Sequence, residues 1–419
     1  MASQSSSRAP SRSVSSRSVS RRNTVTTELS PAEKDKAAQI SAACQDRSLD
    51  RLVSLATSTH GLVSDSLRRT AWPLLLGCAS EDEDGALWRD LPVHRDEHQV
   101  ALDVNRAFVY YPRNESEKQL DQRKEELSDV IIAVLRRHPS LNYFQGYHDI
   151  VQVFLLVLGA QNSPAAVARL SLLRIRDFMA SSLDPALSHL ELLHPILSTA
   201  DPALYDHLPK SQPSFALAGT ITMFAHNIQE YKDIARLFDF FLARNAVMPI
   251  YFFAAAVLSR REEMLEIDKE DEDIMHATLG KLPQPFDVEF HIARTVELYE
   301  RLAPDTLGSF AWWRISSSSV LKTPSAPAEL SNMSLEEGER LLLQQEKEVR
   351  RQQAIKKVMM NAKYLQRRIW YYRKHGALGL TIAVGVYALW LGRSWDGKSQ
   401  LPFIWPLGGI LRRIMSIAV

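Results

Sequence analysis

The sequence has little cysteine and lacks the short motifs by which several enzyme classes hold a phosphate or a metal. Its 419 residues include two cysteines, Cys44 and Cys78, which excludes a disulfide framework and favours a reducing, cytosol-facing compartment. No Gly-rich phosphate loop, GxSxG turn or HExxH helix is present. These absences argue against an independent enzyme active site and against a metal site.

The sequence also lacks a strong charge of either sign and an apolar leader. A net charge of +1 gives no indication of nucleic-acid binding, and 45% hydrophobic residues are ordinary for a folded protein. Residues 1–29 are rich in serine and arginine, with no acidic residue before Glu28. This composition predicts a disordered basic tail, and a mitochondrial transit peptide is the alternative.

Strand patterns are nearly absent, whereas helical patterns follow one another from Ser30 to about Ile315. Ser30-Pro31-Ala32-Glu33 is a capping box that predicts the start of a helix. Apolar residues at three- and four-residue spacing over 127–135 predict an amphipathic helix that ends near Pro139. The run 150–158 is apolar nearly all round and too short to cross a bilayer, which predicts a buried helix. Further helices are expected at 163–179, 184–197, 213–228, 231–243, 248–264, 271–280 and 286–302, so the predicted fold class is all-α.

The composition changes after residue 315. Serines and prolines over 316–333 predict a linker, and a second capping box at Ser334 predicts a helix over 334–375 that ends in a basic run. That run has three open interpretations, namely contact with anionic lipids, a solvated helix face and a membrane-topology signal.

Residues 376–392 are uncharged and predict a short transmembrane segment, with a buried soluble helix as the alternative. Tyr387, Trp390 and Trp395 near one end and the basic run at the other favour the membrane, with the N-terminal side in the cytosol. The tail 393–419 is apolar and basic, which is compatible with an interfacial or a re-entrant segment.

Two polar side chains have conspicuous surroundings. Gln145 lies between Pro139 and the buried helix, where a helix N-terminus offers free N–H groups and a positive dipole end. Arg106 follows Asp103 by three residues, so the carboxylate can hold the guanidinium on one helix face. On spacing alone, a helix-capping loop explains the surroundings of Gln145, and an exposed ion pair with Asp103 explains those of Arg106.

Four sequence blocks, in order, resemble the TBC family of Rab GTPase-activating proteins. The segment 61–77 resembles the GxxxxxR…WxxLLG block, 100–106 resembles IxxDxxR, 143–146 matches YxQG, and 235–241 resembles the RxxD block. The first residue of the second block is Val100 instead of isoleucine, and the proline and threonine common in that block are missing. The resemblance is strongest to a membrane-anchored branch that acts on a Rab of early secretory traffic.

The resemblance implies an all-α domain of two helical subdomains over 30–315 that activates a GTP-bound Rab. Arg106 would be the arginine finger and Gln145 the glutamine finger, with Asp103, Tyr143 and Gly146 in support. GTP and magnesium would belong to the Rab, so no cofactor is expected. The implied location is the endoplasmic reticulum membrane, with the Golgi as the alternative, and the domain would face the cytosol and regulate vesicle traffic between these compartments. A non-catalytic Rab-binding scaffold, a membrane-shaping protein and a mitochondrial tail anchor are the competing interpretations.

Overall fold

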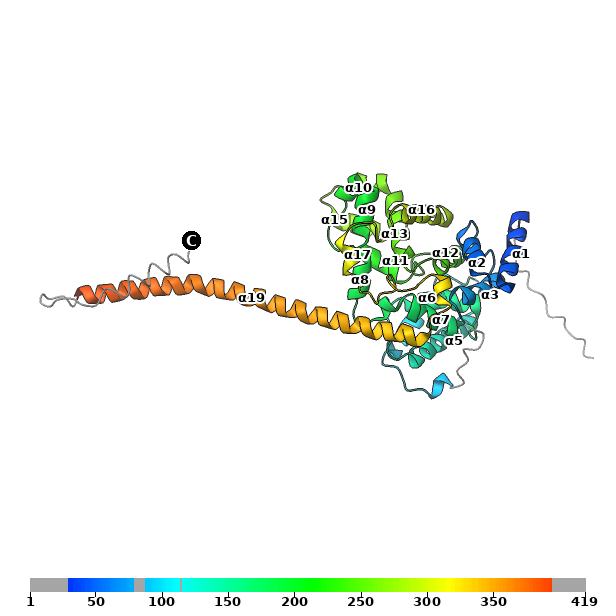
Figure 1. Cartoon of the computed structure of the whole chain (residues 1–419), viewed down its shortest axis with the longest axis horizontal. Coiled ribbons are helices and arrows are strands. Elements are labelled where there is room, and N and C mark those ends of the chain that lie inside the picture. Colours follow the sequence, from blue (N-terminus) through cyan, green and yellow to red (C-terminus); the bar gives the residue numbers. More distant parts are fainter. Residues whose placement is uncertain (1–28, 79–86, 114, 394–419) are drawn as a thin grey trace, which may run out of the picture. The chain divides into compact units, whose positions relative to one another are not determined.

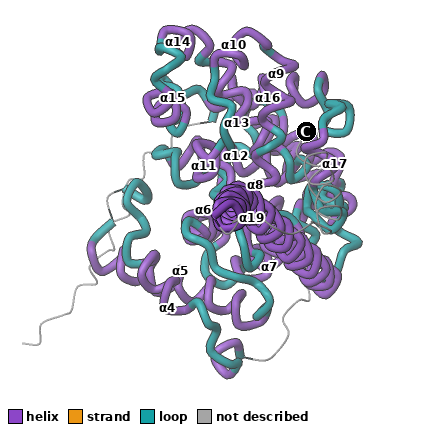
Figure 2. Tube along the Cα trace, turned by 90° about the vertical axis from the view of Figure 1, so that its left-hand side faces the viewer, coloured by secondary structure: helices purple, strands orange, loops and turns teal. Residues whose placement is uncertain are grey.

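The structure, a computed structural model, describes residues 29–78, 87–113 and 115–393. Within these ranges the chain consists of helices joined by loops and contains no strand, which confirms the predicted all-α class (Figures 1 and 2). The predicted tails 1–29 and 393–419 lie almost wholly outside the described residues. The chain divides into two compact units, one up to Glu348 and one from Val349, so the expected pair of helical subdomains does not appear as separate units.

The described residues contain nineteen α-helices and three 3-10 helices. In the first half of the first unit these are α1 (Pro31–Gln45), α2 (Leu49–Thr57), α3 (Asp65–Leu75), η1 (Trp88–Asp90), α4 (Glu97–Val104), α5 (Glu117–Arg137), α6 (Tyr147–Leu158), α7 (Ser163–Leu173) and η2 (Arg176–Met179). Then follow α8 (Asp184–Leu190), α9 (Leu193–Ala200), α10 (Pro202–His207), η3 (Ser214–Ala216), α11 (Leu217–Ile221), α12 (Tyr231–Ala243), α13 (Met248–Ser259), α14 (Arg261–Glu266), α15 (Glu272–Leu279), α16 (Val288–Arg301), α17 (Phe310–Arg314), α18 (Pro327–Leu330) and α19 (Leu335–Arg393).

Several helix ends lie where local sequence chemistry predicts them. Ser30 caps α1: its hydroxyl accepts from the amide of Glu33 at 3.3 Å, and the Glu33 carboxylate accepts from the amide of Ser30 at 2.9 Å. Helix α5 ends at Arg137, two residues before Pro139, because the residue preceding a proline disfavours the helical conformation. Ser334 likewise precedes α19, and its hydroxyl accepts from the amide of Glu337 at 3.2 Å.

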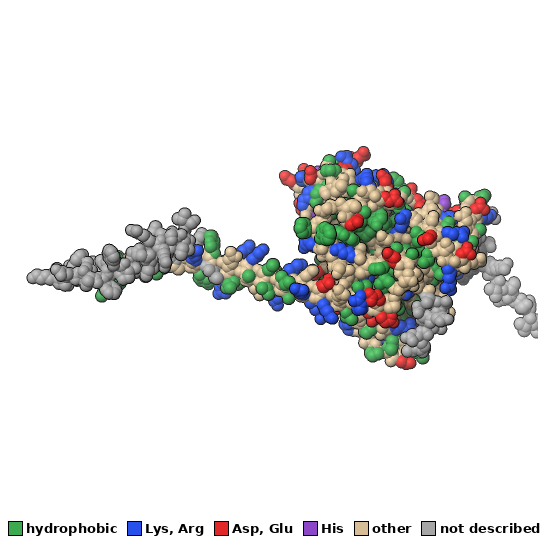
Figure 3. Space-filling model, in the orientation of Figure 1, with side chains coloured by type: hydrophobic (Ala, Val, Ile, Leu, Met, Phe, Trp, Pro, Cys, Tyr) green, Lys and Arg blue, Asp and Glu red, His purple; other side chains and the backbone are tan. Residues whose placement is uncertain are grey.

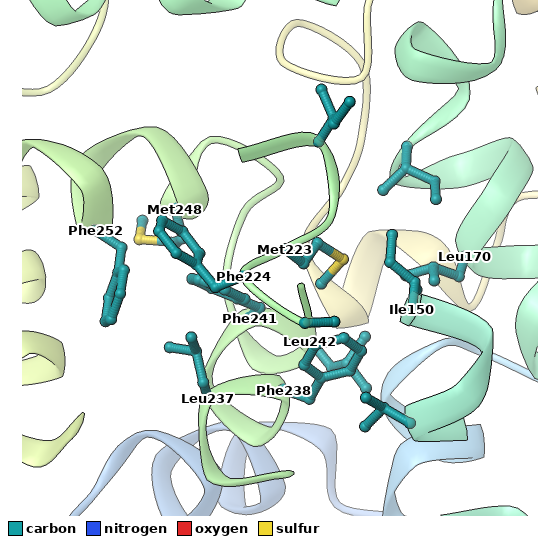
Figure 4. Packing of buried hydrophobic residues seen from close by; sticks show 14 of the residues in the cluster. Ile150, Leu170, Met223, Phe224, Leu237, Phe238, Phe241, Leu242, Met248 and Phe252 are labelled. Atoms are coloured by element: carbon teal, nitrogen blue, oxygen red, sulfur yellow. The ribbon is translucent and has the colours of Figure 1, made fainter. Parts of the chain in front are cut away.

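The core of the first unit lies among α6, α7, α12 and α13, where aromatic and aliphatic side chains interdigitate (Figure 4). Trp72 of α3 is fully buried, with its ring centroid 5.3 Å from that of Phe154 on α6 and 6.0 Å from that of Phe238 on α12. Helix α6 is buried on most of its faces, as the apolar run predicts. The loop that carries Gln145 therefore leads directly into a buried core helix, which fixes its position.

The helix predicted over 213–228 is shorter than expected, and residues 222–230 form a loop. Helix α11 ends at Ile221, and the next residues include Met223 and Phe224 with φ of +50° and +64°. Two consecutive residues in the left-handed region end a helix, and here the amide of Phe224 donates back to the carbonyl of Gly219 at 2.7 Å. Apolar periodicity does not reveal such an ending.

The segment 316–333, predicted as a linker, packs against the domain. Val320 and Leu330 are buried, and the hydroxyl of Ser319 donates to the buried carboxylate of Asp177 at 2.5 Å. The guanidinium of Arg174 on the domain donates to the carbonyl of Ser325 at 2.5 Å. Because the serines and carbonyls of this segment pair with buried charged groups, the domain continues to Glu348 and does not end near residue 315.

In the second unit, the described residues from Val349 to Arg393 are the continuation of α19. Basic and apolar side chains are both exposed along it, as Figure 3 shows for its described part. Among the described residues, no helix contains a stretch that is both long and apolar enough to cross a membrane. The membrane span at 376–392 therefore stays a prediction.

Candidate functional site

Arg106 lies just beyond the end of α4 and projects into solvent. Its guanidinium donates to the Oδ1 atom of Asp103 at 2.6 Å, as the three-residue spacing predicts. The Arg106 side chain is 68% exposed, whereas the Asp103 side chain is fully buried. A buried carboxylate thus orients an exposed, permanently charged group.

Asp103 connects Arg106 to the loop that carries Gln145. The hydroxyl of Tyr143 donates to the Oδ2 atom of Asp103 at 3.1 Å, and Gln99 donates to its Oδ1 atom at 3.2 Å. Burial, followed by the neighbouring Asp103, raises the pKa of Tyr143 above its usual range, so the hydroxyl keeps its proton and donates. Asp103 and Tyr143 therefore hold together two loops that are far apart in the sequence.

Gln145 is exposed in the turn that precedes α6. Its neighbours Phe144 and Tyr147 are buried, with ring centroids 5.7 Å apart, and they anchor the turn in the core. In the described part of the chain, no hydrogen-bond partner holds the Gln145 amide, so both its donor and its acceptor remain for another molecule.

The structure brings Arg106 and Gln145 to one surface hollow of about 200 Å³, which Asp103 also lines. Tyr143 and Gly146 support the hollow without lining it. Exposed apolar side chains also line it, since Val109 is 73% exposed and Tyr110 is 42% exposed. Exposed polar groups next to exposed apolar groups are typical of a surface that receives a macromolecular partner.

Gly146 fixes the backbone at the turn. Its φ is +99°, and a Cβ atom at this position would lie 2.5 Å from the Cγ2 atom of Thr222. We expect Gly146→Ala to lower the free energy of unfolding by about 1–3 kcal/mol and to displace Gln145. A second change, Thr222→Ser, removes the clashing methyl group but keeps the hydroxyl that donates to Ala218.

Denaturant titration would test this expectation. Thr222→Ser should recover part of the loss caused by Gly146→Ala, because the clash is relieved while the strained φ remains. Equal unfolding midpoints for Gly146→Ala and the unchanged chain would contradict it.

Sequence reasoning missed the residue that shapes the loop after Arg106. Gln152 of α6 is buried, and its Oε1 atom accepts from the amide of Phe108 at 2.8 Å. Phe108 has a φ of +63°, so this bond stabilises an unfavourable backbone conformation. The sequence did carry one indication of this role, because Gln152 is the single amide side chain inside the apolar run 150–158.

A histidine pair and an aspartate complete the hollow. The Nδ1 atom of His226 lies 3.0 Å from the Oδ2 atom of Asp149, and the Nε2 atom of His148 lies 3.4 Å from its Oδ1 atom. Burial lowers the pKa of His148, whereas the hydrogen bond to Asp149 raises the pKa of His226. Within the described ranges, no three His, Cys, Asp or Glu side chains are grouped so that they could hold a metal ion.

The first and fourth sequence blocks meet at a buried ion pair in the core. Asp239 of α12 is fully buried and accepts from Arg68 Nη2 at 2.9 Å, from Trp72 Nε1 at 2.8 Å and from the Leu62 amide at 2.9 Å. A Cβ atom on Gly61 would lie 2.6 Å from the Asp239 carboxylate. These blocks stabilise the fold that positions the hollow and do not line it.

Comparisons with known proteins identify the family of this chain. The model of the Rab-GTPase-TBC domain matches residues 65–266. The protein named TBC1 domain family member 20 from Bos taurus is 33% identical over 376 residues, which cover 88% of this chain and 92% of the relative. The GTPase-activating protein gyp10 of Schizosaccharomyces pombe is 32% identical over 263 residues, 61% of this chain and 70% of the relative.

Among solved structures, the Ypt/Rab-GAP domain of Gyp1p superimposes with a TM-score of 0.53 at 15% identity, covering 64% of this chain and 98% of that domain, which supports the fold. The first relative spans most of both chains. This chain therefore belongs to the Rab-GTPase-TBC domain family, the Rab GTPase-activating proteins.

Proposed function

We propose that this chain accelerates GTP hydrolysis by a Rab GTPase of the early secretory pathway and that Arg106 and Gln145 are its two fingers. The observation that carries the proposal is their joint exposure on one hollow, with Arg106 held by the buried Asp103. Membership of a Rab GTPase-activating family supports the reaction class. The early secretory pathway is inferred from the resemblance described above.

Each finger has a separate task. Negative charge spreads over the phosphate oxygens during hydrolysis, and a planar, bidentate guanidinium such as that of Arg106 stabilises this charge. The amide of Gln145 can accept one hydrogen bond and donate another, which is what orienting an attacking water requires. The partner brings GTP and magnesium, and this chain brings Arg106, Gln145 and the groups that position them.

The experiment is single-turnover hydrolysis of GTP by a panel of purified Rabs, with and without the full chain. Acceleration of at least one Rab supports the proposal. The competing function, a non-catalytic scaffold, predicts binding to a GTP-loaded Rab without any change in its hydrolysis rate. That result across the whole panel would favour the scaffold.

We further propose that the C-terminal region attaches the domain to the endoplasmic reticulum membrane, with the Golgi as the alternative. The support is the uncharged sequence 376–392 and the basic run before it, which suits an anionic cytosolic leaflet. A fluorescent fusion of residues 334–419 should therefore label that membrane and resist alkaline extraction. A matched fusion of residues 334–375 should be released, whereas mitochondrial labelling by the longer fusion would contradict the proposed location.

A further inference from the structure

Six polar side chains form a network of close polar contacts across the hollow, in which the approach of His148 to Asp149 is not a hydrogen bond. It begins at Arg106 and passes through buried or half-buried groups to a second exposed group, His226. The successive separations are 2.6 Å from Arg106 to Asp103, 3.1 Å from Asp103 to Tyr143, 3.2 Å from Tyr143 to His148, 3.4 Å from His148 to Asp149 and 3.0 Å from Asp149 to His226. Only the two ends of the network project into solvent.

The two ends of the network are built alike. The His226 side chain is 62% exposed and is held by the Asp149 carboxylate, which is 16% exposed. Arg106 is 68% exposed and is held by Asp103, which is fully buried. At both ends a shielded carboxylate holds a basic group at the surface, and both basic groups line the hollow that Gln145 lines.

We propose that His226, in its charged form, is a third group of this site and contacts a negatively charged oxygen of the GTPase–nucleotide complex. This inference rests on the proposed function. The oxygen belongs either to a phosphate of GTP or to an acidic side chain of the GTPase, because an imidazolium N–H donates to both.

The local chemistry supports this role. With Nδ1 engaged by Asp149, the Nε2 atom is the ring atom that can meet a partner, and in the described residues nothing pairs with it. The hydrogen bond to Asp149 raises the pKa of His226, which extends the charged form to higher pH. The other titratable and charged groups that line the hollow are Asp103 on α4, Arg106 just after it, Tyr110 and Tyr111 in the following loop, and His148 and Asp149 on α6.

These neighbours leave the exposed rim of the hollow cationic. Burial lowers the pKa of His148, so this ring loses its charge at a lower pH than His226 does. The two carboxylates are shielded, whereas Arg106 and His226 are the exposed charges. A positively charged rim suits the phosphates and acidic surface of an approaching GTPase.

The test uses the full chain and a responsive Rab, with single-turnover hydrolysis followed from about pH 6 to about pH 9. A hydrogen bond to a charged group contributes about 1.5–3 kcal/mol, so His226→Gln should slow the stimulated reaction roughly 10- to 100-fold at the lower pH values. For the unchanged chain, stimulation should fall as pH rises through the raised pKa of His226, because the ring then loses its charge. His226→Arg should keep its stimulation at high pH.

Asp149→Asn provides a second, independent variant. It removes the carboxylate that raises the pKa of His226, so the high-pH fall in stimulation should move to lower pH. His276→Gln is the matched control, since His276 is exposed and hydrogen-bonded to Ser214 at 3.0 Å but lies outside the hollow. Intrinsic hydrolysis by the Rab, measured at each pH, is subtracted.

The dependence on chain concentration separates the two possible oxygens. A lower maximal rate for His226→Gln indicates a phosphate contact, and a higher half-saturating concentration with the same maximal rate indicates an acidic side chain. Unchanged kinetics for His226→Gln, or a slower reaction that keeps the pH profile of the unchanged chain, would overturn the inference. Full activity of Arg106→Ala and Gln145→Ala in the same assay would instead overturn the proposed function.

Discussion

Arg106→Ala is expected to remove most of the stimulated GTP hydrolysis, and Gln145→Ala is expected to do the same. An arginine that an activating protein inserts into a GTPase raises the rate of GTP hydrolysis about 10³- to 10⁵-fold. The loss of stimulated rate in Arg106→Ala should therefore approach that range. Arg106→Lys should not restore the rate, because a lysine is a point charge without the planar, bidentate fork. Single-turnover hydrolysis at saturating chain concentration measures all three.

The structure provides a matched control for Arg106. Arg113 lies in the same loop, is similarly exposed and pairs with Glu230 at 2.5 Å, but it does not line the hollow. Arg113→Ala should therefore leave the stimulated rate within about a factor of a few. Because the Gln145 side chain is exposed, Gln145→Ala should unfold at the same denaturant concentration as the unchanged chain. Arg106→Ala also removes the counter-ion of the buried Asp103, which keeps Tyr143 and Gln99 as donors, so this variant should be less stable than the unchanged chain but still folded under assay conditions. Full stimulation by both finger variants on every responsive Rab would refute the two-finger mechanism.

Asp239→Ala is expected to lower the free energy of unfolding by about 3–5 kcal/mol, because it leaves the buried Arg68 guanidinium without its main counter-ion. The same change removes the acceptor of Trp72 Nε1 and of the Leu62 amide, and unpaired buried donors are costly. A loss of this size is a large part of the stability of a typical domain. Denaturant unfolding followed by far-UV circular dichroism measures it.

Asp46→Ala is the matched control for this loss. Asp46 pairs with Arg51 at 3.1 Å, but the two side chains are 63% and 50% exposed, so the change should cost less than about 1 kcal/mol. Arg68→Ala should be nearly as harmful as Asp239→Ala, and the two losses should not add, since each already removes the pair. Equal unfolding midpoints for Asp239→Ala and Asp46→Ala would contradict the structural role given to the buried pair.

Much of the fold follows from local sequence chemistry. The capping boxes at Ser30 and Ser334, the proline after α5 and the apolar run of α6 act over a few residues, and the structure has the corresponding helix ends. The loop 222–230 and the docked segment 316–333 depend on backbone conformation and on distant partners. Periodicity and composition therefore assigned the first to a helix and the second to a linker.

The residues of the candidate site likewise fall into those that a local motif reveals and those that depend on a distant partner. Arg106, Gln145 and Asp103 came from motifs that each lie within seven consecutive residues, and the structure brings the three together. His226 could not be identified in this way, because its partner Asp149 is 77 residues away and its loop was predicted to be helical. Gln152 was hidden for a related reason, since its hydrogen bond to Phe108 spans 44 residues.

The shared carboxylate of Asp103 has a consequence for the motions of the site. Its Oδ1 atom holds Arg106 and its Oδ2 atom holds Tyr143, two residues before Gln145. A displacement of either loop therefore changes the position of the group that restrains the other. The two proposed fingers, Arg106 and Gln145, are expected to fluctuate together, so that their approach to a bound GTPase would be a correlated movement and not two independent searches.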